Sequence, residues 1–404
     1  MAKKKREDVR EEDVTGLKYF DKLVPLLARL HDVGCQRDKA GNRMLHCDQY
    51  CLLVLLFLFN PAIRSLRAIE QASELRKVQR RLGCQRASLG SLSEATDIFE
   101  PARLQEIIAE LGEQLEPIAR DSRLKDVQHA LTLADSTLLK GLPVLFQAGV
   151  ADHRRARMEA KVRLHTQFDL QRGVPIRIDV TEGLHRGPAD ERAVLAQALE
   201  KGRCYVTDRG YAKFKLFNAI AAAQSSYVCR LRDNSVYEII QQRDLSEDDR
   251  QAGVIFDGEV RLGETSHSCE VRPDHAVRLV IIPTTPHEKR HAGVPRSQGL
   301  LLIATNLLDL PAWIIGLIYR YRWTIEIFFR FFKHVLGCRH LLSRDPVGIE
   351  IQTYCAIIAC MLISLWTGRK PTLRTYEMIC HYFTGLAEED ELLAHLAKLQ
   401  KHAD

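Results

Sequence analysis

The hydrophobic pattern of this 404-residue chain predicts an α/β protein, in which a mixed sheet is flanked by helices. Apolar residues recur at helical spacing up to about residue 124, and from about residue 129 they alternate as in strands. The chain is also longer than one ordinary compact core requires, which indicates two or three folding units. We therefore expect an all-helical N-terminal domain, residues 1–124, ahead of the sheet.

The alternating runs give the order of the elements in the sheet. Three strands, a helix, a strand, a helix and a strand are expected at residues 131–135, 162–170, 176–180, 188–202, 204–206, 213–223 and 226–231. This order is typical of an open α/β core that carries helices on both faces.

The second half of the chain departs from this regular order. Residues 236–298 contain short β-like runs between loops rich in Gly, Pro and His, and they are interpreted as a β-rich insertion. A strand at 300–304 follows, and then one long helix from Pro311 to Leu336 with the proline near its start. We expect the α/β domain to span 125–368 and a helical tail to span 369–404.

The charge balance permits nucleic-acid binding without requiring it, because Lys and Arg number 58 against 52 Asp and Glu. Basic residues concentrate on an expected helix between Arg64 and Arg81, and the Ser-rich step from Ser88 to Ser93 then leads into another helix. Such a pair could enter a DNA groove as helix-turn-helix modules do. A charged face in contact with solvent accounts for the pattern equally well.

The cysteines and apolar runs favour an intracellular protein without a membrane span. Eleven scattered cysteines contain no Cys-x-x-Cys pair, so Cys47 and Cys51 beside His46 are interpreted as core packing. No secretory signal is recognisable at the start. The apolar runs 52–59 and 356–366 are shorter than the roughly 20 residues that cross a bilayer. We expect buried core helices and a cytoplasmic protein.

Three acidic residues are the candidates for chemistry. Asp135 ends the first expected strand and Asp208 follows the fourth, and open α/β sheets place functional groups at such strand ends. Glu326 lies on the long helix. A lone aspartate at a strand end is commonly a turn residue, so the prediction depends on the three acids together.

The long helix carries a polar stripe that includes Glu326. At 100° per residue, Tyr319, Arg322, Glu326 and Lys333 fall within about 60° of one another. In-line phosphoryl transfer uses two divalent cations about 3.5–4 Å apart, and magnesium or manganese ions prefer carboxylate oxygens. The three acids could hold such a pair, while Arg322 and Lys333 neutralise phosphate oxygens and Tyr319 donates to one.

The stripe also has a specific spacing, namely Tyr, two residues, Arg, three residues, Glu, six residues, Lys. In this the sequence resembles the bacterial insertion-sequence transposases of the Asp-Asp-Glu (DDE) type, in particular the insertion-sequence-four group. The run from Leu131 to Thr137 looks like the strand of the family's first Asp, and Tyr205 to Tyr211 looks like its second-Asp motif. The resemblance covers residues 125–368.

The resemblance implies a ribonuclease-H-like core and a DNA transposase. By it, Asp135, Asp208 and Glu326 bind two Mg²⁺ ions, which Mn²⁺ can replace, and catalyse cleavage at transposon ends and strand transfer. Tyr319, Arg322 and Lys333 would then be DNA-binding residues. The implied partners are double-stranded DNA, both the terminal inverted repeats and the target, and a second copy of the chain in a homodimer on paired ends.

The sequence departs from the family in one respect, and two other functions stay open. Relatives commonly stack a flipped base on a tryptophan of the insertion, but here Trp occurs only at 313, 323 and 366. Phe256 or Tyr237 could replace it, although packing in the sheet is the simpler account. The alternatives are a catalytically silent DNA-binding regulator derived from a transposase, and a ribonuclease-H-like nuclease that does not join strands.

Overall fold

The computed structural model divides into two compact units. One comprises Met1–Glu116, Lys140–Ala160 and Arg330–Asp404, and the other comprises Pro117–Leu139 and Lys161–Phe329. The residues described are 23–33, 37–38, 43–115, 121–140, 161–182, 187–263, 271–284, 299–335, 341–343, 345–367 and 370–400. Leu336, the expected end of the long helix, and parts of the expected insertion lie outside them. The expected domain boundaries stay a prediction.

The first unit is built from helices in its described residues. These are α1 (Val24–Ala28), α2 (Leu30–Val33), α3 (Cys47–Phe59), α4 (Leu66–Ser73), α5 (Arg76–Leu82), α6 (Leu89–Ile98), α7 (Ala102–Gln114), α13 (Pro346–Thr367), α14 (Leu373–Thr384) and α15 (Glu389–Gln400). Helices α3 and α13 are apolar all round, and α13 packs against both α3 and α7. They form the core of this unit, with Cys47 and Cys51 buried in it as expected.

In the part of the chain that the structure describes, one helix is long and apolar enough to cross a membrane, by length and composition alone. It is the stretch Pro346–Leu365 of α13, with a mean hydropathy of 1.7. Because 89% of this stretch is buried inside the structure, α13 serves here as a core helix.

The expected basic helix between Arg64 and Arg81 is two helices. The Ser73 hydroxyl donates to the Glu70 carbonyl and accepts from the Ala87 amide, so it competes with the helical bonds where α4 ends. Leu75 is extended, and α5 begins after it. Five cations of this stretch are exposed. Arg67 lies on α4, Arg64 lies just ahead of the N-cap of α4, and α5 carries Arg76, Lys77 and Arg80. Their role in DNA binding stays a prediction.

The second unit contains a nine-stranded sheet in the order β3-β2-β1-β4-β5-β9-β8-β7-β6. The strands are β1 (Ala130–Lys140), β2 (Lys161–Asp169), β3 (Val174–Glu182), β4 (Arg203–Thr207), β5 (Ser226–Arg230), β6 (Tyr237–Gln242), β7 (Phe256–Leu262), β8 (Val277–Pro283) and β9 (Leu300–Thr305). Strand β4 is parallel to both of its neighbours, β1 and β5. The pairs β2–β3, β5–β9, β9–β8, β8–β7 and β7–β6 are antiparallel. The sheet is therefore mixed, as predicted.

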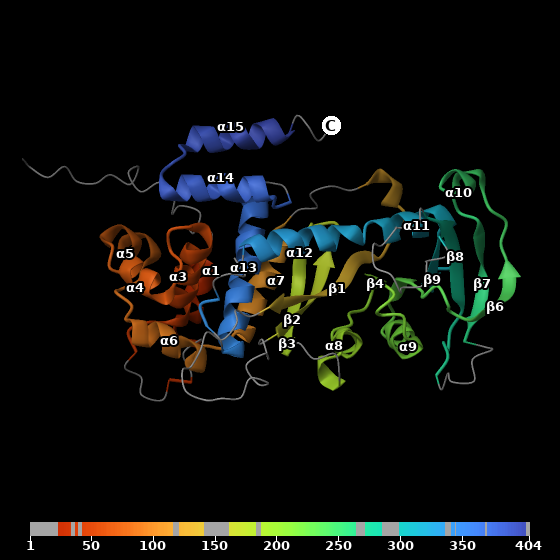
Figure 1. Cartoon of the computed structure of the whole chain (residues 1–404), viewed down its shortest axis with the longest axis horizontal. Helices are drawn as coiled ribbons and strands as arrows, with labels where there is room; N and C mark the ends of the chain where they lie inside the picture. Colours follow the sequence, from red (N-terminus) through yellow and green to blue (C-terminus); the bar gives the residue numbers. More distant parts are fainter. Residues whose placement is uncertain are drawn as a thin grey trace, which may run out of the picture. The chain divides into compact units, whose positions relative to one another are not determined.

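Helices cover both faces of this sheet (Figure 1). Helices α8 (Glu191–Gln197) and α9 (Phe214–Ala222) lie on one face, where Phe217 stacks on Tyr227 of β5 with ring centroids 4.2 Å apart. Helix α11 (Ala312–Arg320) packs on the other face against β4, β5, β8 and β9. It comes so close that a Cβ on Gly316 would lie 2.6 Å from the tip of the Ile282 side chain, so a larger residue there would require that side chain to shift. The predicted α/β class is confirmed.

The expected β-rich stretch continues the main sheet. Strand β9 pairs with both β5 and β8, so strands β8, β7 and β6 extend the sheet outward from the core. Helix α10 (Glu247–Gln251) connects β6 to β7. Tyr237 and Phe256 are partly buried against the core cluster of this unit, which agrees with sheet packing for both rings.

The prediction of one continuous helix from Pro311 to Leu336 is wrong. Helix α11 ends at Arg320 and α12 (Trp323–Val335) begins after a turn at Tyr321 and Arg322. Around this turn the backbone amides bond to carbonyls three residues back, as from Thr324 to Tyr321 and from Ile325 to Arg322. Aromatic and β-branched residues cluster here, and their low helix propensity favours the interruption.

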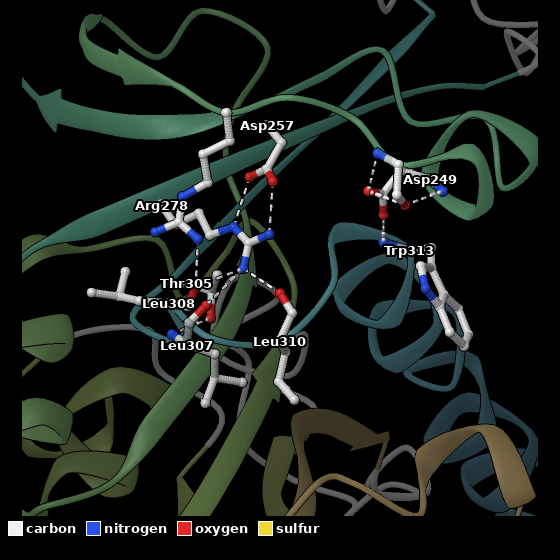
Figure 2. Close-up of polar contacts among 10 residues, drawn as sticks. Asp249, Asp257, Arg278, Thr305, Leu307, Leu308, Leu310 and Trp313 are labelled. Carbon is white, nitrogen blue, oxygen red and sulfur yellow. Dashed lines mark hydrogen bonds and ion pairs between the residues drawn. The ribbon is translucent and has the colours of Figure 1, made fainter.

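A buried ion pair fastens the outer strands to the start of α11 (Figure 2). Arg278 of β8 donates from Nε and Nη2 to the two oxygens of Asp257 of β7, both at 2.7 Å. Its third nitrogen, Nη1, donates to the carbonyls of Leu307, Leu308 and Leu310. The guanidinium therefore fixes the loop that leads from β9 into α11.

Helix α11 receives its N-terminal cap from α10. Its own N-cap residue is Pro311, whose side chain offers no acceptor. The Asp249 carboxylate accepts from the Trp313 amide at 2.8 Å instead, as Figure 2 shows. A carboxylate at this end satisfies an amide that has no partner within the helix and interacts favourably with the helix dipole. The start of α11 therefore depends on residues from the outer strands and their connection.

We expect Asp257→Ala to lower the free energy of unfolding by about 3–5 kcal/mol, because the substitution leaves the Arg278 charge buried without its counter-ion. Glu238→Ala is the matched control, since Glu238 of β6 pairs with Arg261 of β7 at 3.3 Å and both side chains are more than half exposed. It should cost less than about 1 kcal/mol. Denaturant unfolding followed by circular dichroism measures both. Equal losses would contradict the role given to the buried pair.

Candidate active site

The first two candidate acids lie side by side on neighbouring parallel strands. Strands β1 and β4 pair in a register that places Leu133 beside Val206, and the same offset two residues further brings Asp135 level with Asp208. Neighbouring strands are about 4.8 Å apart. Strand β1 continues to Lys140, so Asp135 lies within it and not at its end as expected, whereas Asp208 directly follows β4.

Backbone amides orient both carboxylates. The Ser136 amide donates to Asp135 Oδ1 and the Gly210 amide donates to Asp208 Oδ1, each at 2.8 Å. At Gly210 the space is limited as well. A Cβ on Gly210 would lie 2.9 Å from Asp208 Oδ1 and 3.0 Å from Glu191 Oε1. Glycine therefore leaves the space that these two carboxylates occupy.

Arg322 connects the third acid to the first. Its Nη2 donates to Glu326 Oε1 at 2.7 Å, and its Nη1 lies 3.9 Å from Asp135 Oδ2. The guanidinium also lies 5.8 Å from the centre of the Tyr319 ring, in cation–π contact. Because the Arg322 side chain is 15% exposed, these charges interact where water screens them only partly. Arg322 therefore brings Glu326 and Asp135 to the same site.

The acidity of Asp135 is strongly perturbed. Burial raises the pKa of its carboxyl from 3.8 to about 7, and the nearby charges of Asp208 and Glu191 raise this pKa further. The Ser136 amide and Arg322 act in the opposite direction without cancelling the effect. Holding several carboxylates together here is thus unfavourable unless a proton or a cation compensates their charge.

The structure also brings in an acid that sequence reasoning missed. Glu191, the first residue of α8, accepts a hydrogen bond from the Ser136 hydroxyl at 2.7 Å and lies 3.5 Å from Arg163. A single glutamate in an amphipathic helix has no spacing that distinguishes it from a residue facing solvent. Only its position between the two aspartates in the sequence could have suggested it.

The remaining predicted residues lie on the two helices. Tyr319 is partly buried at the end of α11, and burial raises the pKa of its hydroxyl. Lys333 lies on α12 beyond Phe329, in the segment that belongs to the other unit. The DNA-binding roles of Tyr319, Arg322 and Lys333 stay predictions.

A second group of potential metal ligands lies in the first unit. One ligand atom from each of His31, Asp32 and His46 comes within 4.8 Å of the others. The two imidazole rings stack with centroids 3.7 Å apart, and His31 Nδ1 is 3.0 Å from Asp48. Any measurement of metal binding to the whole chain must therefore allow for this group.

The chain belongs to the transposase DDE domain family, which it matches over residues 127–362. The prediction of a DDE-type transposase is thereby confirmed at the level of the family. A DDE domain implies dependence on a divalent metal. The site fits such an ion, because Asp135 and Asp208 offer adjacent carboxylate oxygens and the burial of Asp135 favours a compensating cation.

Two curated relatives of the chain are also named as transposases. The chain is 27% identical over 206 residues to the putative transposase y4zB of Sinorhizobium fredii, which covers 50% of this chain and 53% of that protein. It is also 27% identical over 207 residues to the probable transposase for insertion sequence element IS5377 of Geobacillus stearothermophilus, covering 50% and 49%. The chain thus spans about half the length of the curated relatives it matches.

Solved transposase structures resemble the chain only distantly. A piggyBac transposase synaptic complex with hairpin DNA aligns with 97% of this chain and 85% of its own, at 11% identity and a TM-score of 0.40. The Mos1 transposase paired-end complex aligns with 40% and 56%, at 13% identity and a TM-score of 0.18. Scores this low do not establish a shared arrangement of elements.

In chelator, we expect Asp135→Asn to become more stable than the wild type as the pH rises. The folded wild type holds the Asp135 proton up to about pH 7, whereas the unfolded chain releases it near 3.8. Between these values the wild type therefore loses stability that the neutral variant keeps, by roughly 2–4 kcal/mol. Unfolding at pH 4 to 8 measures the difference, and Mg²⁺ at pH 8 should reduce it. Parallel stability curves would contradict the assignment.

We expect Gly210→Ala to weaken metal binding more than folding. Gly210 has no positive φ, so alanine fits its backbone, but the new Cβ displaces the carboxylates of Asp208 and Glu191. The affinity for Mn²⁺ should fall about tenfold or more, as when groups that orient metal ligands are altered. Stability should change by less than about 1 kcal/mol. Gly90→Ala, where a Cβ meets an ordinary contact of 3.9 Å, is the control. Unchanged affinity would show that the acids tolerate displacement.

Proposed function

We propose that this chain is a DNA transposase of the insertion-sequence-four group, with a ribonuclease-H-like core, that cuts at transposon ends and joins them to target DNA. One observation carries the proposal: Asp135 of β1 lies near Asp208, which directly follows the neighbouring parallel strand β4, and Arg322 contacts both Asp135 and Glu326. The family match and the names of the relatives agree with it.

Within this proposal, Asp135, Asp208 and Glu326 hold two Mg²⁺ ions, which Mn²⁺ can replace. Such ions, when bound, lower the pKa of the attacking water and stabilise the charge that develops on the phosphate. The amides of Ser136 and Gly210 keep the two aspartates oriented before metal or DNA arrives. This preorganisation avoids rearranging the ligands during the reaction.

The proposed reaction consists of two displacements at phosphorus. In the first, a water oxygen attacks a phosphodiester at the transposon end, the bond from phosphorus to the 3′-oxygen breaks, and a 3′-hydroxyl is released. In the second, this 3′-hydroxyl attacks a target phosphodiester, and the target's own 3′-oxygen leaves. One ester bond forms as another breaks in the second step, so the joining needs no external source of energy.

The partners are proposed to be double-stranded DNA and a second copy of the chain. Tyr319, Arg322 and Lys333 would contact the terminal inverted repeat, and the helical N-terminal segment would supply further basic contacts. Trp323 is 53% exposed and directly follows Arg322, so it offers an aromatic face on which a base could stack. A homodimer in the cytoplasm would pair the two transposon ends.

Strand cleavage and joining on a labelled duplex that carries the element's own end test this proposal. We expect metal-dependent nicking and a joined product, both reduced at least about a hundredfold in Glu326→Gln, because the neutral amide is a poor ligand for Mg²⁺. Glu200→Gln is the matched control, since Glu200 pairs with Arg203 on the surface of the same unit. It should keep wild-type activity.

The same assay separates the alternatives. Tight binding of the end without cleavage in any divalent metal would favour a regulatory DNA-binding protein. Cleavage without a joined product would favour a nuclease, because both reactions use the same acids and differ only in the nucleophile admitted. Full activity of Glu326→Gln would sink the assignment of the third acid.

A further inference from the structure

We propose that Glu191 is a fourth carboxylate of the metal site, which ligates a divalent cation together with Asp208 and Asp135. This inference rests on the proposed function, and it adds a ligand that the three-acid pattern does not contain. It comes from the geometry around Ser136, which directly follows Asp135, and Gly210, which lies two residues after Asp208.

The first observation is the distance between two carboxylate oxygens. Asp208 Oδ1 and Glu191 Oε1 approach the same point, the position of a Cβ on Gly210, to 2.9 and 3.0 Å. The two oxygens are therefore within about 6 Å of each other, a span that a pair of cations about 3.5–4 Å apart can bridge. Asp208 is held there by the Gly210 amide, so its orientation is fixed on this side.

The second observation is that one oxygen of Glu191 is anchored and the other is not. Its Oε2 accepts from the Ser136 hydroxyl at 2.7 Å and lies 3.5 Å from Arg163 Nη1. Across the described residues, no hydrogen bond or ion pair reaches Oε1, the oxygen beside Asp208. Ser136 also orients Asp135 through its amide at 2.8 Å. One residue thus positions the two acids on either side of it.

The third observation concerns charge. Two divalent cations would add four positive charges to a site that already holds Arg322, so a fourth carboxylate brings the total charge closer to balance. The charged Glu191 lies at the site itself, because Ser136, which donates to it, also holds Asp135 through its amide. Its side chain is 19% exposed, so this charge is not fully screened by water. Carboxylates that lie together in this way would therefore favour the binding of a cation more than carboxylates that lie apart.

A purely structural role is the competing account. Arg163 is 9% exposed, and Glu191 could serve only to compensate its charge. In that case the loss of Glu191 would lower stability and leave the affinity for metal unchanged. If Glu191 is a ligand, its loss should lower the affinity for metal and leave stability in chelator unchanged. The two roles can therefore be separated without any measurement of catalysis.

The experiment is calorimetric titration of the full chain with Mn²⁺, without DNA. The background is His31→Ala with His46→Ala, which removes two of the three potential ligands of the group in the first unit. Glu191→Gln should weaken binding by about tenfold or more, as Asp208→Asn should, whereas Glu200→Gln should not. Glu191→Asp, which keeps the charge, should fall between the wild type and Glu191→Gln and guards against a folding defect. Thermal unfolding in chelator tests each variant for stability.

The outcomes distinguish this inference from the proposed function. If Asp208→Asn loses affinity and Glu191→Gln keeps it, Glu191 is not a ligand and the three-acid site stands. If neither substitution changes the affinity, the metal site itself is wrongly assigned, and both proposals fail. Loss of affinity in Glu191→Gln, with wild-type stability in chelator and partial recovery in Glu191→Asp, is the result we expect.

Discussion

The parallel pairing of β1 with β4 is the constraint on which the site depends. It places Asp135 level with Asp208, and two carboxylates at that separation repel each other wherever water is partly excluded. In the chain without a cation, burial raises the pKa of Asp135 first and the charge of Asp208 raises it further, while Arg322 lies close to two of the acids. Burial and repulsion together are therefore the physical reason that the site favours positive charge.

The position of Arg322 depends in turn on strands far from the acids in the sequence. The buried Arg278 holds the loop that ends at Leu310, and the Asp249 carboxylate caps the first turn of α11. These contacts fix where α11 begins, and its length then determines where the turn at Tyr321 and Arg322 occurs. The stretch that interrupts the α/β pattern is thus an integral part of the scaffold that positions the site.

Much of this was predictable, and the failures have physical causes. The alternating runs gave the strands because a half-buried strand must alternate, and the spacing from Tyr319 to Lys333 gave the motif. The turn between α11 and α12 was missed because a helical pattern continues through a break of two residues. Glu191 was missed because its partner Ser136 is 55 residues away, and no local pattern records such a contact.

The break between α11 and α12 explains how one guanidinium reaches two acids. On a regular helix an Arg four residues before a Glu is the less favourable order of the pair, so helix stability alone does not account for the bond from Arg322 to Glu326. The neighbouring Tyr321 hydroxyl donates to Asp121 at 2.6 Å, just ahead of β1 in the chain. The turn is therefore fastened to the segment that leads into β1, the strand of Asp135. Glu326 is thus held near the aspartates by this polar network as well as by the packing of the helices.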